Sequence, residues 1–258
     1  MIPFDLDRLQ RETFVRHIVY LEETGSTNTV ALNLAESELE RAPILVLAAR
    51  QTAGRGRGGN HWWSSEGALT FSVVVDGDAT CLPRERRSLA SLATGLAVAD
   101  AIASLMPQAE VGVKWPNDVH LNGKKVSGIL VESAGRGDRL VIGVGINVNN
   151  SLTDAPSEIA ERAISLVDFS GALFNLSRVL TLVLQQLYRR VMSPDSELGL
   201  LIEDLRRRCV LTGRRVVIEV GQERVGGLCC GLDEDGALLV SSHGGVRRII
   251  AGVVTALE

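Results

Sequence analysis

Residues 51–59, with the sequence QTAGRGRGG, constrain this chain more than any other segment. Four of the last six residues are glycine, which tolerates positive φ and lets a backbone approach a ligand closely. Arg55 and Arg57 place two fixed positive charges in this flexible stretch, directly after the apolar run 44–49. A loop of this kind at a strand end is suited to close over an anionic ligand.

The glycine spacing also matches the GxGxxG fingerprint of dinucleotide-binding folds. That fingerprint needs a helix to begin at the glycines, so that backbone N–H groups bind the pyrophosphate. Residues 60–67 contain Trp62, Trp63 and a Ser-Ser-x-Gly turn, and they lead to a strand-like run at 68–75. A phosphate-binding Walker A loop is excluded because no Gly-Lys-Ser/Thr follows. We therefore expect a loop between two strands, with an ordinary surface turn as the plain alternative.

Length and charge narrow the class of protein. A chain of 258 residues forms one large domain or two unequal ones. A net charge of −4 argues against a dedicated nucleic-acid-binding protein. Residues 1–7 lack the basic and apolar parts of a signal peptide, and no apolar run approaches the roughly 20 residues of a membrane span. We expect a cytoplasmic protein whose four cysteines are small buried side chains in a reducing environment.

The hydrophobic pattern predicts alternating strands and helices in the first four fifths of the chain. Polar residues at 151–169 predict a loop, and Asn122-Gly123 between two strand-like runs predicts a hairpin with a type I′ turn. Pro116 places its segment at a sheet edge or bend, and Gly143 and Gly145 on one strand face predict a groove for a flat ligand. The expected strands are 17–21, 44–49, 68–75 and 140–148, and the expected helices follow residue 28 and span 89–106, 172–192 and 196–208.

Short strands separated by turns characterise the chain from Cys209 onwards. We predict a catalytic domain at 1–208 and a small β domain at 209–258. Cys229 and Cys230 are adjacent, so on a strand their side chains point to opposite faces and are unlikely partners for one metal.

The charged and amide side chains that could bind a ligand or take part in a reaction lie in four turns at strand ends. These turns are residues 25–28, 51–59, 114–128 and 143–147. Their cations suit phosphate or carboxylate oxygens, and Asp118 suits Mg²⁺, which binds one or two carboxylates together with phosphates. These turns contain no cysteine, and the chain suggests no Ser-His-Asp arrangement. Phosphoryl or nucleotidyl transfer by positioning and charge is the chemistry that remains.

These motifs, in this order and spacing, resemble those of the biotin–protein ligases over roughly residues 17–150. The motifs are Ser26-Thr27-Asn28, the segment from Gln51 to Trp62, Lys114-Trp115-Pro116-Asn117-Asp118, Lys125-x-x-Gly128-Ile129-Leu130 and Gly143-x-Gly145-Ile146-Asn147. The resemblance implies an α+β fold: a mixed β-sheet flanked by helices, related to class II aminoacyl-tRNA synthetase cores, with a C-terminal SH3-like β-barrel. It also implies that biotin and MgATP form biotinyl-5′-adenylate, which a lysine of a biotin carboxyl carrier protein then attacks.

The resemblance assigns roles to individual positions. Ser26, Thr27, Asn28 and Gln51 would bind the ureido group of biotin and form the pocket mouth. Arg55 and Arg57 would contact the biotin carboxylate and ATP phosphates, and Lys125 would stabilise charge on the carboxyl or acyl-phosphate oxygen. Lys114 and Asn117 would bind phosphate or the metal, and Asp118 would orient the incoming lysine or bind Mg²⁺. Gly56, Trp62, Gly128, Gly145 and Asn147 would shape the biotin site, its floor and the adenine side, with a core role for Trp62 as the alternative.

Two features depart from the best-known members. Only 25 residues precede Ser26, so we expect a ligase without a DNA-binding repressor role. Gly58 replaces a side chain found in some relatives, which makes the loop more flexible. A lipoate or octanoyl transferase of the same core fold, and a non-enzymatic biotin- or nucleotide-binding module, are the rival functions. We expect no nucleic-acid or membrane partner, and a monomer or homodimer.

Overall fold

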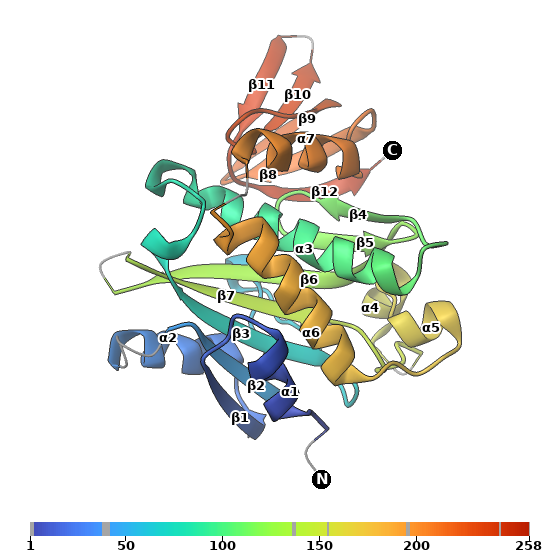
Figure 1. The fold of residues 1–258 in the computed structure, drawn as a ribbon. Coiled ribbons are helices and arrows are strands. Elements are labelled where there is room, and N and C mark those ends of the chain that lie inside the picture. Colours follow the sequence, from blue (N-terminus) through green and yellow to red (C-terminus); the bar gives the residue numbers. More distant parts are fainter. Residues whose placement is uncertain are drawn as a thin grey trace.

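A seven-stranded mixed sheet forms the centre of the protein (Figure 1). The computed structural model describes residues 3–37, 42–135, 138–153, 155–194, 197–242 and 244–257. The strand order is β1-β2-β3-β7-β6-β5-β4, and only β1 and β2 pair in parallel. The strands are β1 (His17–Thr24), β2 (Ile44–Gln51), β3 (Leu69–Asp76), β4 (Val111–Lys114), β5 (Asp118–Leu121), β6 (Lys124–Ala134) and β7 (Arg139–Ile146). The prediction of a mixed sheet flanked by helices is confirmed.

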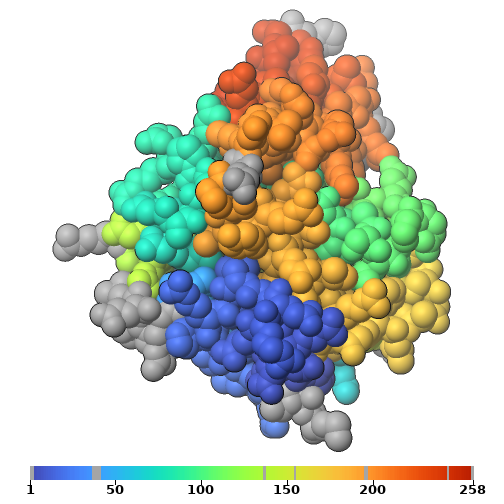
Figure 2. Space-filling model, viewed as in Figure 1, coloured from blue at the N-terminus to red at the C-terminus, as the bar shows by residue number. Residues whose placement is uncertain are grey.

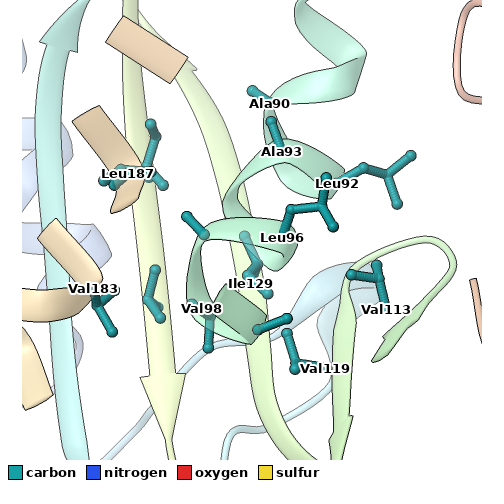
Figure 3. Packing of buried hydrophobic residues seen from close by; sticks show 14 of the residues in the cluster. Ala90, Leu92, Ala93, Leu96, Val98, Val113, Val119, Ile129, Val183 and Leu187 are labelled. Atoms are coloured by element: carbon teal, nitrogen blue, oxygen red, sulfur yellow. The ribbon is translucent and has the colours of Figure 1, made fainter. Parts of the chain in front are cut away.

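Helices cover both faces of this sheet because its strands carry apolar side chains on each side. On one face α3 (Ala90–Leu105) packs against the sheet and α6 (Leu176–Leu187), and Figure 3 shows Leu96 of α3 near Ile129 of β6. On the other face α2 (Thr27–Ser37) packs on β2, β3 and β7. Helix α1 (Leu6–Glu12) contacts α6.

One helical stretch of the described residues, 84–105, is long and apolar enough to cross a membrane by length and composition. It consists of a 3₁₀ turn at Arg84–Leu89 followed by α3, and 67% of its most apolar window is buried inside the protein. A helix that forms the centre of a core is apolar for the same reason as a membrane span, so packing accounts for its composition.

A second, five-stranded antiparallel sheet follows α7 (Leu198–Arg208), and its residues form one end of the molecule in Figures 1 and 2. Its order is β11-β10-β9-β8-β12, consistent with an SH3-like domain. The strands are β8 (Arg215–Val220), β9 (Glu223–Leu232), β10 (Leu238–Ser242), β11 (Gly245–Ile249) and β12 (Val253–Leu257). Two contacts hold the two sheets together. Cys209, between α7 and β8, forms an isolated parallel β-bridge with Val113 of β4. Trp115 Nε1 donates a hydrogen bond to the carbonyl of Gly236, between β9 and β10, at 3.2 Å.

Local turn chemistry is where sequence and structure agree best. Asn122 (φ 47°) and Gly123 (φ 83°) form the tight turn between β5 and β6, as a type I′ turn requires. Pro116 lies in the turn after β4, which is an edge strand. Cys229 is buried and Cys230 exposed, because adjacent residues of a strand face opposite sides. The expectation of four buried cysteines is therefore wrong for Cys230, and also for Cys81, which is half-buried.

The predicted loop at 151–169 is wrong. It contains two short helices, α4 (Ser157–Arg162) and α5 (Leu166–Ser170). Helices of six and five residues are too short to show a 3.6-residue apolar period, and α5 is specified instead by its cap, because the Ser165 side chain accepts from Asp168 N. Helix α1 and strand β12 are two further elements that the hydrophobic pattern did not predict.

Candidate functional site

A cleft of about 490 Å³ lies where the four predicted turns meet. Its walls come from the start of α2, the loop after β2, the β4–β6 hairpins and the α2-facing side of β7. The predicted residues that line it are Ser26, Thr27, Asn28, Gln51, Arg55, Gly56, Arg57, Trp62, Lys114, Asn117, Asp118, Lys125, Gly128 and Gly145. Side chains that are far apart in sequence therefore share one site.

Buried polar groups form one end of the cleft. Ser26, Thr27 and Asn28 are 3–5% exposed at the start of α2. Gln51 Oε1 accepts from the Thr27 backbone N–H at 2.7 Å and lies 3.1 Å from Thr27 Oγ1. The end of β2 thus fixes the first turn of α2, where helical N–H groups otherwise lack partners. The Gln51 amide N–H₂ group remains a donor for a ligand.

Asn28 is held from both ends of its amide. Its Nδ2 donates to the Leu130 carbonyl at 3.1 Å and to Glu132 Oε2 at 2.9 Å, and its Oδ1 accepts from Ser72 Oγ at 2.6 Å. A Cβ on Gly143 would lie 2.0 Å from Asn28 Oδ1, so only glycine leaves room for this side chain. Glu132 and Ser72 were not identified from the sequence, because neither belongs to a recognisable motif.

The loop after β2 folds back on itself. Gly56 N donates to the Asn60 carbonyl at 2.7 Å, and Trp62 N donates to the Gly54 carbonyl at 2.9 Å. A 3₁₀ turn at Arg57–Gly59 replaces the helix that a dinucleotide site requires, which confirms the strand–loop–strand prediction. Gly58 (φ 67°) and Gly59 (φ 81°) adopt left-handed backbone conformations that other residues rarely take.

Trp62 occupies the groove that the sequence assigned to a flat ligand. A Cβ on Gly145 would lie 2.4 Å from Trp62 Cε2, and one on Gly128 would lie 3.2 Å from Cζ3. The indole therefore lies against the glycine-bearing strands, and Lys125 Nζ is 5.8 Å from its ring centroid. The alternating glycines are needed here for the side chains of Trp62 and Asn28, which is a correction to the expected empty groove.

Lys125 and Asp118 form an ion pair in the cleft, with Nζ 2.6 Å from Oδ1. Burial lowers the pKa of Lys114; the nearby Asp118 opposes that shift and the charge of Lys125 reinforces it. Burial also lowers the pKa of His120 to about 4, with Lys114 acting in the same direction, so this imidazole is neutral at pH 7. Within the described ranges no group of three or more His, Cys, Asp or Glu side chains is placed to hold a metal ion.

Of the two predicted asparagines, Asn117 lies in the cleft and Asn147 lies outside it. Asn117 lines the cleft, and its Nδ2 donates to the Ile129 carbonyl at 2.8 Å. Asn147 does not line it; its Oδ1 accepts from Asn150 Nδ2 at 3.0 Å, and its backbone carbonyl accepts from Leu166 N. In the structure Asn147 supports the chain leaving β7 and does not line the cleft.

The five-stranded sheet and its turns supply a wall of the cleft that the sequence did not predict. The lining residues from this part of the chain are Glu219, Gly221, Gly252, Val253 and Val254. Arg57 Nη1 donates to the Gly252 carbonyl at 2.7 Å, which joins the loop to this wall. No local motif marks these residues, because only the packing of the two sheets brings them to the site.

Comparison with known proteins agrees with this geometry. Residues 20–149 match the biotin/lipoate A/B protein ligase family. A biotin–[acetyl-CoA-carboxylase] ligase of Mycobacterium tuberculosis is 36% identical over 250 residues, which cover 94% of this chain and 90% of that protein. The chain belongs to the biotin/lipoate A/B protein ligase family.

Further members of the family show the same relationship along the whole chain. A biotin–[acetyl-CoA-carboxylase] ligase of Paracoccus denitrificans is 32% identical over 91% of this chain and 98% of that protein. The solved structure of the biotin protein ligase from Aquifex aeolicus in complex with biotin and ATP is 29% identical and superposes with a TM-score of 0.77, covering 94% of this chain and 99% of that one. The similarity includes the C-terminal sheet as well as the family region.

Proposed function

We propose that the chain is an ATP-dependent biotin–protein ligase that forms biotinyl-5′-AMP and transfers biotin to a lysine of a biotin carboxyl carrier protein. The observation that carries this proposal is the convergence of Arg55, Arg57, Lys114 and Lys125 on one cleft that ends in a buried polar corner. The names of similar proteins and the biotin and ATP of the Aquifex aeolicus complex support it. The family region alone also includes lipoate enzymes, so the substrate needs a direct test.

The buried corner suits the ureido group of biotin. Ser26, Thr27, Asn28 and Gln51 offer donors and acceptors that water reaches poorly. A ligand lacking a matching acceptor would leave the Gln51 amide N–H₂ group, the donor still open to a ligand, without a partner at a cost of about 1–3 kcal/mol. This corner therefore favours biotin over a purely aliphatic acid.

In the first step a carboxylate oxygen of biotin attacks the α-phosphorus of ATP, and the bond to the pyrophosphate oxygen breaks. Arg57, Lys114 and Lys125 line the cleft where negative charge builds up, and fixed charges in a sheltered site stabilise such a transition state strongly. Asp118, together with phosphate oxygens, would hold Mg²⁺, which neutralises phosphate charge when bound. The protein contributes no covalent intermediate, so positioning supplies much of the rate.

In the second step the amine of the carrier lysine attacks the acyl carbon of the adenylate, and the bond to the AMP oxygen breaks. The amine attacks in its neutral form; its nitrogen gives up one of its two protons to solvent as the amide forms and keeps the other. Asp118 Oδ1 lies 2.6 Å from Lys125 Nζ, so this carboxylate already holds one lysine side chain in the cleft. We propose that Asp118 orients that lysine while Lys125 binds the acyl or phosphate oxygen.

Mass spectrometry of a carrier domain tests this function. The protein, ATP and biotin are incubated with a biotin carboxyl carrier domain, and in parallel with lipoic acid or octanoic acid in place of biotin. We expect the mass shift of one biotin, absent when ATP is omitted or the carrier lysine is replaced by arginine. A shift with lipoic acid and none with biotin would assign the chain to the lipoate branch, and biotin binding without any shift would make it a binding module.

We also propose that this ligase acts in the cytoplasm and represses no genes. A net charge of −4 provides no general attraction to the DNA backbone. In a mobility-shift experiment with biotin and ATP at low salt we expect no complex with double-stranded DNA. A specific shifted band would contradict this part of the proposal.

A further inference from the structure

Glu132 connects the start of α2 with the loop after β2, two parts of the cleft that belong to separate sequence motifs. It lies on β6 and its side chain is 24% exposed. One carboxylate oxygen, Oε1, is 2.5 Å from Arg55 Nη2, and the other, Oε2, accepts from Asn28 Nδ2 at 2.9 Å. The loop after β2 and the first turn of α2 are thus joined through one carboxylate.

The partners of Glu132 are both expected to touch biotin. Asn28 belongs to the buried polar corner, and Arg55 lines the same cleft from the loop. Arg55 Nη1 also lies 3.4 Å from Thr29 Oγ1, which leaves further guanidinium N–H groups for a substrate carboxylate. The Arg55 side chain is 41% exposed, so without Glu132 it would sample many rotamers.

Glu132 also decides which way the Asn28 amide faces. The two acceptors at Nδ2 are Glu132 and the Leu130 carbonyl, and the donor at Oδ1 is Ser72. Because an amide can flip, this arrangement of partners selects the orientation with the oxygen towards Ser72. A carboxylate is needed because it offers acceptors to Asn28 and Arg55 at the same time.

We infer that Glu132 is a positioning residue for biotin: it fixes the Asn28 amide and the Arg55 guanidinium, and so holds the loop at residues 51–59 over the biotin end of the cleft. This inference rests on the proposed function. Glu132 itself does not line the cleft, so its effect passes through its two partners.

Glu132→Gln tests the inference with almost no change in shape. Glutamine keeps one acceptor and turns the other into a donor, so it cannot serve Asn28 and Arg55 together. We expect biotin binding, measured by calorimetry, to weaken about tenfold, the loss of one charge-assisted hydrogen bond. We expect the KM for biotin to rise while the KM for ATP and the melting temperature stay near wild type, and residues 52–61 to exchange amide hydrogen faster.

Glu23→Gln is the matched control. Glu23 Oε2 is 3.2 Å from Arg50 Nε, an exposed ion pair between β1 and β2 outside the cleft. The same substitution there should leave biotin affinity and loop exchange unchanged.

A double-mutant cycle with Arg55→Gln separates positioning from a general effect on folding. If Glu132 acts partly through Arg55, the double variant should lose less than the sum of the two single losses. Full additivity, or Glu132→Gln with wild-type biotin affinity and loop exchange, would overturn the inference. If Glu132→Gln fails to fold, Glu132→Asp replaces it, and a melting-temperature loss without a selective change in biotin KM would also overturn it. A wild-type protein that does not biotinylate would instead refute the proposed function.

Discussion

Arg57 Nη1 donates a hydrogen bond to the carbonyl oxygen of Gly252 at 2.7 Å, although the two residues are 195 positions apart in the chain. Gly252 directly precedes β12 of the C-terminal sheet, and Arg57 lies in the loop after β2. The cleft is therefore covered jointly by a loop of the seven-stranded sheet and by the edge of the five-stranded sheet. Under the proposed function, Arg57 would hold the adenylate, and its bond to Gly252 joins the two sides of this cover.

Replacing Arg57 by Gly should release the adenylate early. The variant loses both the positive charge and the bond to Gly252. A hydrogen bond to a charged group contributes about 1.5–3 kcal/mol, so we expect the adenylate to dissociate about 10- to 100-fold faster. Bystander lysines on an unrelated protein should then become biotinylated, which an anti-biotin blot detects.

Arg57→Lys is the control for this experiment. Lysine restores the charge but lacks the planar guanidinium, so retention of the adenylate should be intermediate. Adenylate retention by the glycine variant equal to that of the wild type would refute a holding role for Arg57.

Lys125→Ala should slow adenylation far more than it weakens biotin binding. Lys125 lies in the cleft beside Asp118, and in the proposed reaction negative charge develops there as pyrophosphate leaves. Removing a comparable preorganised group costs about 10²–10³ in turnover, whereas we expect biotin affinity to change less than about tenfold. Stopped-flow adenylation and calorimetry measure the two quantities.

The neighbouring Lys124→Ala provides the comparison, since Lys124 is exposed on the same hairpin. Its kinetics should match the wild type. Equal losses of turnover and biotin affinity in Lys125→Ala would reassign Lys125 to uniform substrate binding.

The features that the sequence predicted correctly are mostly those that a few neighbouring residues determine. The Asn122-Gly123 turn needs positive φ at both positions, and the apolar composition of α3 extends over 16 residues. The predicted site residues other than Asn147 also line one cleft, because turns at the same end of one sheet lie close together.

The features that the sequence did not predict are mostly those that depend on contacts between distant segments. The bond from Arg57 to Gly252 and the pairing of Glu132 with Arg55 depend on segments distant in sequence. The glycines of β7 predicted a groove correctly but not its occupant, since the position of Trp62 depends on how the loop folds back. Helices α4 and α5 were missed because six and five residues are too few to repeat the 3.6-residue apolar period.

Gly145→Ala should displace Trp62. The added methyl group would lie 2.4 Å from the indole, so the ring or the strand must move. Overpacking of this kind costs about 1–3 kcal/mol. We expect a lower melting temperature and altered tryptophan fluorescence, together with weaker biotin binding because Trp62 lines the cleft.

Gly199→Ala is the matched substitution in α7, where no atom outside the helix lies within 4 Å of the added methyl group. Alanine there should be neutral or stabilise by up to about 1 kcal/mol. If both variants had the same melting temperature and biotin affinity, the close packing of Trp62 on Gly145 would be wrong.

His120 should make the protein less stable as the pH falls from 6.5 to 4. Its pKa is lowered to about 4 by burial and by Lys114, with a smaller effect of Lys125, and Asp118 opposes the shift. Between pH 4 and the ordinary value of 6.5 the unfolded chain binds a proton here that the folded chain does not, so the free energy of unfolding increases with pH. The full contribution is present above pH 6.5, and its loss at pH 4 is on the order of 3 kcal/mol.

Chemical denaturation of the wild type and of His120→Asn at a series of pH values measures the contribution of His120 to the free energy of unfolding. The contributions of the other titrating groups cancel when the free energies of the two proteins are subtracted. Asparagine can still donate towards the Gly123 carbonyl, which lies 3.0 Å from His120 Nδ1, but it does not titrate. The stability difference should favour the wild type increasingly from pH 4 to 6.5 and become constant above pH 7. A difference that is constant across the whole range would show that His120 accepts its proton equally well in the folded and unfolded states.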